Sequence, residues 1–142
     1  MDTFLTLFDV VGELARRRYQ AAERYFSALG LNHTEARLLT LLGQQGGIAT
    51  QDALSNLIFV DRSNTGRALQ HLEQAGHIER RKDDADKRTK LVQITAKGQT
   101  TIADIARIRS KMAQDFFGDL TEDEAGSIVD LLSKALKDDG HA

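Results

Sequence analysis

The sequence contains neither cysteine nor proline among its 142 residues. Without cysteine the chain forms no disulfide, no thiolate zinc site and no iron–sulfur cluster, and it has no cysteine nucleophile or oxidant-sensing thiol. Long apolar runs are also missing. The longest stretch without a charged residue, 38–51, is shorter than the roughly 20 apolar residues of a membrane-spanning helix. These absences, with 41% hydrophobic residues to fill a core, predict a folded globular protein without a membrane partner.

Basic residues are slightly outnumbered, 19 against 21 acidic ones, but they are unevenly distributed. Residues 1–60 carry a net charge of −1, residues 61–111 carry +5, and residues 112–142 carry −6. Net charge sums over faces of opposite sign, so the total of −2 does not exclude a nucleic-acid partner. At the amino terminus, Asp2 stands where a secretory signal has basic residues, which favours a cytoplasmic location.

Apolar side chains at steps of three and four predict one long helix from Phe4 through Tyr25. Gly30 offers a left-handed cap after it. Asn32 with Glu35, or alternatively Thr34, offers the start of a second helix that ends near Gln44. A third, short helix that buries Ala53, Leu54 and Leu57 is expected after an extended piece at 48–49 and the cap residues 50–52. Asp61 is expected to begin a fourth, which turns Thr65, Leu69, Leu72 and Ala75 inward.

From Ile78 the apolar period changes to two. Segments 78–82 and 90–94 flank a polar tip, 83–89, and predict a β-hairpin. Thr95 is expected to cap a long helix, which Gly118 interrupts, and Thr121 with Glu124 forms a capping box for the last one. The fold class is therefore mainly α with a small β-hairpin. Two short helices followed by a basic hairpin are typical of a winged helix-turn-helix lobe.

The outward face of the fourth helix and the hairpin tip carry the side chains expected to touch DNA. Arginine and asparagine can read base edges in a major groove, and a basic tip can reach a minor groove. The expected DNA contacts are Arg62, Ser63, Asn64, Arg67, Gln70, His71, Lys87 and Arg88. Asp86 is expected to brace the guanidinium of Arg88 rather than to face DNA. The alternative, that this helix face is only solvated, is disfavoured by its place between a tight turn and a basic hairpin.

No pattern for catalysis, metal binding or a cofactor is found. The four histidines, at 33, 71, 77 and 141, have neither i, i+4 spacing on one helix nor a recurring acidic partner. There is no Gly-x-Ser-x-Gly elbow and no phosphate-binding glycine loop. We therefore expect no enzymatic activity, no cofactor and no metal.

The motifs together resemble the MarR family of bacterial transcriptional regulators. The resemblance rests on segments 61–65 and 72–80, on Asp86-Lys87-Arg88 in the hairpin, and on Ile94-Thr95-Ala96-Lys97-Gly98 after it. It implies a homodimer that reads a pseudo-palindromic operator in double-stranded DNA, most often as a repressor. It also implies that residues 1–30 and 99–142 form a helical dimerisation region and that residues 31–98 form the winged helix-turn-helix. Gly66 is a departure, because relatives commonly carry a larger residue there.

Apolar surface at the two ends of the chain agrees with dimerisation. One apolar stripe, near the amino terminus, includes Phe4 and Leu7, and the other, near the carboxyl terminus, includes Leu132 and Leu136. Together they carry more apolar surface than so short a chain easily covers. The alternative is that both stripes form one monomer core.

The resemblance further implies release from DNA by a small aromatic or phenolic acid that binds between the dimer helices and the winged lobe. The candidate ligand-binding residues near that junction are Arg16, Tyr19, Tyr25, Phe26 and His33, each of which also has a plain packing or surface role as its alternative. The lack of cysteine excludes a thiol-based switch. The alternatives to a ligand-responsive regulator are a constitutive DNA-binding regulator and a winged-helix protein-interaction module.

Overall fold

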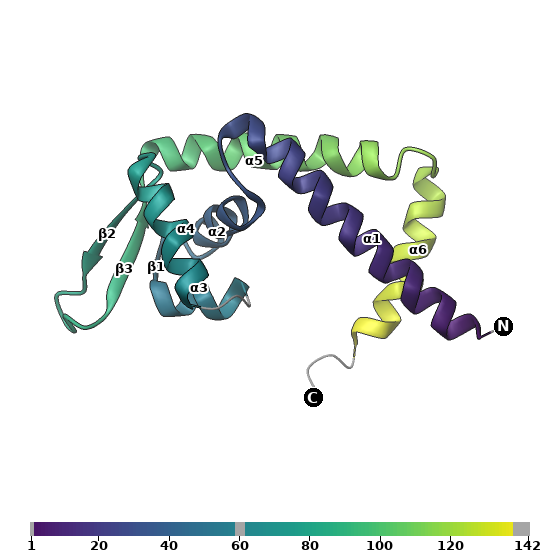
Figure 1. The fold of residues 1–142 in the computed structure, drawn as a ribbon, viewed down its shortest axis with the longest axis horizontal. Helices are drawn as coiled ribbons and strands as arrows, with labels where there is room; N and C mark the ends of the chain where they lie inside the picture. The colour runs from purple at the N-terminus through teal and green to yellow at the C-terminus, as the bar shows by residue number, and fades with distance from the viewer. Residues whose placement is uncertain (1, 59–61, 138–142) are drawn as a thin grey trace.

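The computed structural model describes residues 2–58 and 62–137, and for Arg62 it describes the backbone only. One winged lobe and two projecting helices are joined by a long helix (Figure 1). The elements in chain order are α1 (Thr3–Phe26), the 3₁₀ turn η1 (Ser27–Leu29), α2 (His33–Gln44), β1 (Ile48–Thr50), α3 (Gln51–Ile58), α4 (Arg62–Gln74), β2 (Ile78–Lys82), β3 (Lys90–Ile94), α5 (Ala96–Phe116) and α6 (Glu122–Leu136). The mainly helical fold class with a hairpin wing is confirmed.

The predicted hairpin is confirmed with the predicted boundaries. β2 pairs with β3 antiparallel, with Arg80 opposite the fully buried Val92. The backbone N–H of Asp83 donates to the carbonyl of Thr89 at 2.9 Å and closes the tip. The short extended piece after α2 is β1, which pairs with the other side of β3, so the sheet has the order β1-β3-β2.

Most helix ends follow the predicted capping chemistry. Gly30 has a φ of 71° in the left-handed region, and the Asn32–Glu35 and Thr121–Glu124 capping boxes are both formed. The hydroxyl of Thr50 accepts from the backbone N–H of Ala53 at 3.0 Å at the start of α3. The predicted start of α4 at Asp61 lies outside the described residues.

The core lies between the end of α1, α2, α3, α4, the sheet and the first half of α5. Its largest fully buried side chains are Leu38, Leu39, Leu42, Leu54, Thr65, Leu69, Leu72, Val92 and Ile105. Two expectations are wrong. Ala75 is exposed, because α4 ends at Gln74 and Ala75 belongs to the following turn, while Ala68 is buried instead. In α3, Ile58 is buried and Leu57 is 38% exposed.

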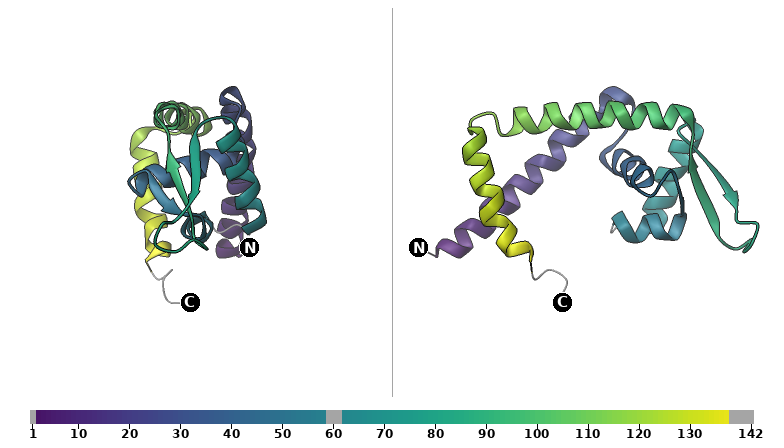
Figure 2. Two further views of the ribbon diagram at one scale, coloured as in Figure 1. Left: turned by 90° about the vertical axis from the view of Figure 1, so that its left-hand side faces the viewer. Right: turned by 180° about the vertical axis from the view of Figure 1, so that it is seen from behind.

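The two projecting helices leave large apolar side chains uncovered. Phe4 and Phe8 on α1 are 84% and 77% exposed, and Leu131 and Leu136 on α6 are 63% and 67% exposed. None of the residues described in α6 is buried. Seen with the winged lobe toward the viewer, α1 and α6 lie on opposite sides of the molecule (Figure 2). Within one chain, therefore, the two apolar stripes do not form a shared core. No described helix is long and apolar enough to cross a bilayer.

The corner between the sheet and α5 explains the Ile-Thr-x-x-Gly motif. The hydroxyl of Thr95 donates to the carbonyl of Gly76 at 2.6 Å and accepts from the backbone N–H of Gly98 at 3.1 Å. A Cβ atom on Gly98 would lie 2.2 Å from the carbonyl oxygen of His77 and 2.7 Å from Ile94. Only glycine permits this approach of α5 to the turn after α4.

Replacing the two glycines that the motifs single out should have opposite effects. Gly98→Ala should lower the free energy of unfolding by about 1–3 kcal/mol, because the backbone must move apart. Gly66→Ala should raise it by about 1 kcal/mol, because the added Cβ lies 3.6 Å from Gln51 and alanine favours a helix. Chemical denaturation at one protein concentration measures both. Equal stability of the two variants would contradict the close approach at Gly98.

Candidate nucleic-acid interface

The outward face of α4 is a row of exposed polar side chains. Ser63, Asn64, Arg67, Gln70 and His71 are all exposed, while the opposite face of α4 packs into the core. Arg62 begins the helix, and its side chain lies outside the described residues. The structure thus places five of the six predicted α4 residues on one open surface, with hydrogen-bond donors available along it.

Two of these side chains are held by neighbours. The guanidinium of Arg67 donates to the side-chain oxygen of Asn64 one turn earlier. His71 Nδ1 lies 3.2 Å from Glu35 Oε2, and the other oxygen of Glu35 accepts from the backbone N–H of Asn32 at 2.9 Å in the α2 capping box. The side chain of Glu35 is only 7% exposed. The contact between His71 and Glu35 therefore links the exposed face of α4 to the first turn of α2.

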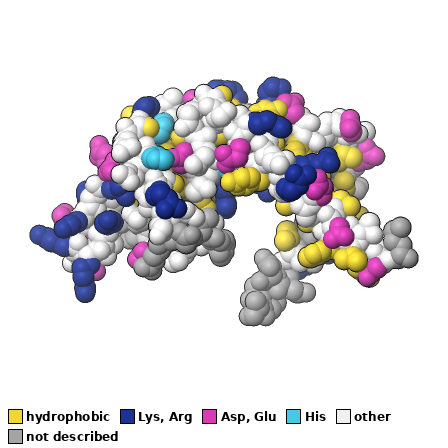
Figure 3. All heavy atoms as spheres, in the orientation of Figure 1, with side chains coloured by type: hydrophobic (Ala, Val, Ile, Leu, Met, Phe, Trp, Pro, Cys, Tyr) yellow, Lys and Arg dark blue, Asp and Glu magenta, His cyan; other side chains and the backbone are white. Residues whose placement is uncertain are grey.

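The tip of the wing presents a strongly exposed arginine. The side chain of Arg88 is 94% exposed. Asp86 Oδ1 accepts from the backbone N–H of Arg88 at 3.1 Å and lies 3.5 Å from its Nε, while Asp86 Oδ2 accepts from the hydroxyl of Thr89 at 3.2 Å. Lysine and arginine side chains gather over the wing in the space-filling view (Figure 3). Asp86 thus contacts both the backbone of the tip and the guanidinium that projects from it.

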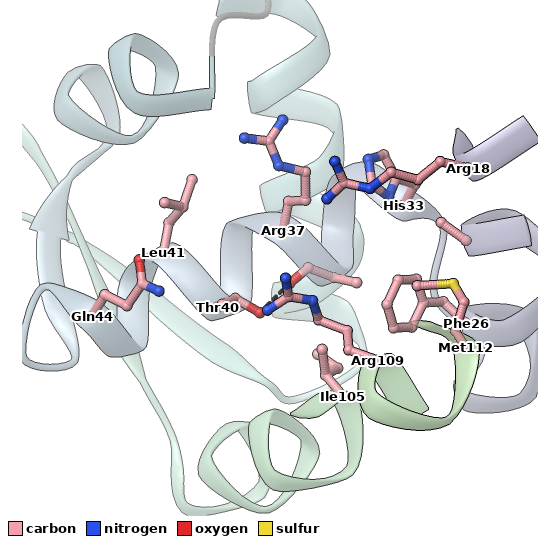
Figure 4. Close-up of a pocket in the computed structure, with 12 residues that line it drawn as sticks. Arg18, Phe26, His33, Arg37, Thr40, Leu41, Gln44, Ile105, Arg109 and Met112 are labelled. Carbon is pink, nitrogen blue, oxygen red and sulfur yellow. Dashed lines mark hydrogen bonds between the residues drawn. The ribbon is translucent and has the colours of Figure 1, made fainter. Parts of the chain in front are cut away.

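A separate cavity of about 230 Å³ lies where α1, α2 and α5 meet. Arg18, Arg37 and Arg109 come from these three helices and line the cavity, with the guanidinium of Arg18 beside His33 (Figure 4). Its remaining lining is mostly apolar or uncharged and includes Ala22, Phe26, Ala36, Thr40, Leu41, Gln44, Ile105 and Met112. None of the three guanidinium groups has a carboxylate partner among the described residues.

His33 contributes a buried polar atom to this cavity. Its Nδ1 is buried without a hydrogen-bond partner in the described part of the chain, and its ring meets Tyr19 edge to face at 5.2 Å between centroids. Burial lowers the pKa of His33 below its ordinary value, and the positive charges of Arg37, Arg18 and Arg109 lower it further. The carboxylate of Glu23, which accepts from the backbone N–H of His33 at 3.0 Å, opposes this shift. A cavity lined by three arginines that pair with no carboxylate in the described part of the chain, and by an imidazole nitrogen without a partner there, suits an anion.

A metal centre is not formed within residues 2–58 and 62–137, where no group of three His, Asp or Glu side chains could hold an ion. His33 and His71 lie in the separate sites described above, and His77 Nδ1 lies 3.2 Å from the hydroxyl of Thr101 in the core. His141 lies outside the described residues.

Comparison with known proteins identifies the family. A family model described as MarR family matches residues 29–89. The putative transcriptional regulatory protein for the hcr operon of Thauera aromatica is 31% identical over 138 residues, which cover 92% of this chain and 82% of that protein. The chain belongs to the MarR family. HTH-type transcriptional regulator PapX of Escherichia coli is 26% identical over 117 residues, covering 82% of this chain and 71% of PapX.

Solved structures share the fold of this MarR-family chain. Wild-type MarR from E. coli, without ligand, superimposes with a TM-score of 0.83 at 24% identity and covers 92% of this chain and 96% of its own. A mutant of E. coli MarR complexed with operator DNA superimposes with a TM-score of 0.78 at 24% identity, over 96% and 99% of the two chains. Family membership and the named relatives confirm the expectation of a transcriptional regulator rather than an enzyme.

The predicted ligand-binding residues of this MarR-family chain do not all share one cavity. Phe26 and His33 line it, and Tyr19 contacts His33 from outside. Arg16 does not line it, because Arg16 pairs with Glu13 at 2.5 Å on the exposed side of α1. Tyr25 does not line it either, because its hydroxyl donates to Asp115 of α5.

The three charged residues that line the cavity were not predicted from the sequence. Arg18 lies eight residues before Phe26, and Arg37 lies four residues after His33, so helical spacing could have placed each on the same face as its partner. Arg109 belongs to α5 and has no such local signal, because only the tertiary fold brings it to α1 and α2.

Proposed function

We propose that this MarR-family chain is a homodimeric, sequence-specific DNA-binding regulator that acts as a transcriptional repressor. The observation that carries the proposal is that one lobe presents both an exposed polar face on α4 and, at the wing tip, the exposed Arg88, which Asp86 contacts. A major groove is about 12 Å wide and admits a helix such as α4. A narrow minor groove attracts a side chain such as Arg88.

Each predicted contact has a role in this proposal. Arg67 and Asn64 read base edges, Arg62 and Ser63 at the start of α4 bind phosphate or base edges, and Gln70 and His71 extend the contact along the helix. Lys87 and Arg88 contact the backbone and the minor groove, while Asp86 fixes the tip. The relative of similar fold that was solved with operator DNA supports this assignment.

The uncovered stripes of α1 and α6 support dimerisation. Residues 1–30 and 99–142 form the proposed dimerisation region and residues 31–98 the DNA-binding region. A second copy that covers Phe4, Phe8, Leu131 and Leu136 removes the largest exposed apolar surface of the chain. Two α4 helices related by a two-fold axis then read half-sites about 34 Å apart.

The arginine-lined cavity supports control by a small aromatic acid. Its volume of about 230 Å³ lies below the roughly 300–1,000 Å³ of sites for drug-sized ligands, so it suits a single-ring anion. The cavity joins α1 and α5 of the proposed dimer region to α2 of the winged lobe. A ligand that binds more tightly to a conformation in which the two winged lobes of the dimer have the wrong separation for DNA lowers the affinity of the protein for DNA. A constitutive regulator would leave these cations and the His33 nitrogen without a function.

Replacing Arg67 on α4 and replacing Arg88 at the wing tip should weaken DNA binding in different ways. Arg88→Ala should weaken binding to every duplex and reduce the steepness of its salt dependence, because it loses a charge near the backbone. Arg67→Ala should weaken binding to a selected operator by about 1–3 kcal/mol and also relax sequence preference. Fluorescence anisotropy with duplexes selected from a random pool measures both effects.

Arg107→Ala is a matched control for these variants, because Arg107 is exposed on α5 and pairs with Asp104 away from the wing. It should bind as the wild type does. If Arg67→Ala and Arg88→Ala also bound as the wild type does, the interface would be wrong, and a winged-helix module for protein contacts would take its place.

Sedimentation at micromolar concentration should give twice the chain mass of 15.7 kDa. Leu131→Glu, which puts a charge on the exposed apolar face of α6, should dissociate the dimer. Gln20→Glu, on an exposed polar position of α1, is the control and should leave the dimer intact. A wild-type protein that sediments at 15.7 kDa would contradict dimerisation.

Benzoate should release the protein from its operator and raise the pKa of His33 toward its ordinary value, because the anion offsets the surrounding guanidinium charges. Arg109→Ala should lose at least about tenfold in benzoate affinity. Arg16→Ala, outside the cavity, should respond as the wild type does. NMR titration of the histidine ring and anisotropy with operator report the two effects. An unchanged His33 pKa and unchanged DNA affinity would favour the constitutive regulator.

A further inference from the structure

Arg80 lies in the middle of the basic hairpin but does not join its exposed surface. It stands on β2 opposite the buried Val92, on the same side of the strand as the buried Ile78. Its side chain is 21% exposed, against 94% for Arg88 at the tip. One of the positive charges that mark the hairpin as a wing is therefore directed toward the lobe.

The contacts of Arg80 join three elements of the winged lobe. On α4, Glu73 Oε2 accepts from the backbone N–H of Arg80 at 3.2 Å, and Glu73 Oε1 accepts from Nη2 at 3.1 Å and Nε at 3.3 Å. On α3, the side-chain oxygen of Gln51 accepts from Arg80 Nη1 at 3.5 Å. A planar guanidinium with donors on two sides fixes direction as well as distance, which a lysine ammonium does not.

Besides these contacts, the wing joins α4 at its root, and β1 pairs with β3 from Gln93 to Leu91. The turn between α4 and β2 includes Gly76, at a φ of 86°, and is held against α5 by Lys97 and Thr95. These contacts fix the first residue of β2. The pairing of β1 with β3 holds the hairpin to the segment before α3, and Arg80 adds a side-chain link from β2 to α4 itself.

We infer that Arg80 is a positioning residue, which holds the wing at a fixed angle to α4 so that both engage one duplex together. The inference rests on the proposed DNA-binding function. When two contact surfaces are rigidly joined, binding of the first brings the second to its site at high effective concentration. Without the link to Glu73, the wing tip keeps its charge but loses this advantage.

Glu73→Gln separates positioning from simple charge. The change removes a negative charge from the helix proposed to bind DNA, so electrostatics alone predicts tighter binding. Positioning predicts the opposite: Glu73→Gln and Arg80→Lys should each weaken operator binding by about five- to tenfold, although Arg80→Lys keeps its charge. Arg81→Lys, at the exposed neighbouring position, is the matched control and should bind within about twofold of the wild type.

A double-mutant cycle then tests whether the wing itself is affected. Arg88→Ala should weaken binding less in the Arg80→Lys background than in the wild type, because Arg88 on a misplaced tip contributes less to the binding free energy. In the Arg81→Lys background, Arg88→Ala should weaken DNA binding by as much as it does in the wild type. Thermal unfolding of each variant shows that the comparison is made between folded proteins.

The outcomes separate this inference from the proposed function. If Arg88→Ala weakens wild-type binding, but Glu73→Gln tightens binding or the cycle shows no coupling, the positioning role is overturned and the DNA-binding function stands. If the wild type binds no selected duplex, both are overturned. If Glu73→Gln and Arg80→Lys both fail to fold, the contact is a requirement of the fold, and the positioning role is likewise overturned.

Discussion

The first turn of α5 packs against the turn after α4 so closely that no side chain fits between them. Gly98 makes this approach, and Thr95 bonds to both sides of the corner. The recognition-type helix α4, the root of the wing and the long helix α5 all meet here. Because the three elements share one rigid corner, the position of α5 determines where the polar face of α4 and the wing tip lie.

The arginines of the chain fall into groups with different partners, which a segment-by-segment charge count does not reveal. Arg67 and Arg88 are exposed, and each is steadied by a neighbour, Asn64 or Asp86. Arg80 is turned inward onto Glu73. The three cavity arginines come from three different helices and pair with no carboxylate among the described residues. The same residue type thus lies on an outer surface, in an internal link and around a cavity proposed to bind an anion, according to the residues beside it.

Local features of the sequence predicted most of the fold. The capping box at Asn32 and the alternation from Ile78 depend on residues a few positions apart, so helix starts and the hairpin register could be derived directly. The polar face of α4 followed from helical period alone. The error at Ala75 arose where the period was extended beyond the end of the helix.

The cavity could be predicted only in part, because its residues come from three helices far apart in the chain. The sequence indicated the junction, and with it Phe26 and His33, but it could not say which side of α1 faces α5. Arg16 and Arg18 differ by two positions and point in different directions on a helix, so a choice between them requires the packed structure. The inward turn of Arg80 has the same origin, since its partner Glu73 lies on another element.

Helix α6 is 15 residues long and none of its described side chains is buried. A helix of about this length is marginal in water unless another surface covers it. In the proposed dimer a second copy supplies that surface, so α6 would form as the two chains associate. The amount of protein in a cell then determines how much of it is fully folded, so its synthesis rate and its regulatory competence are coupled.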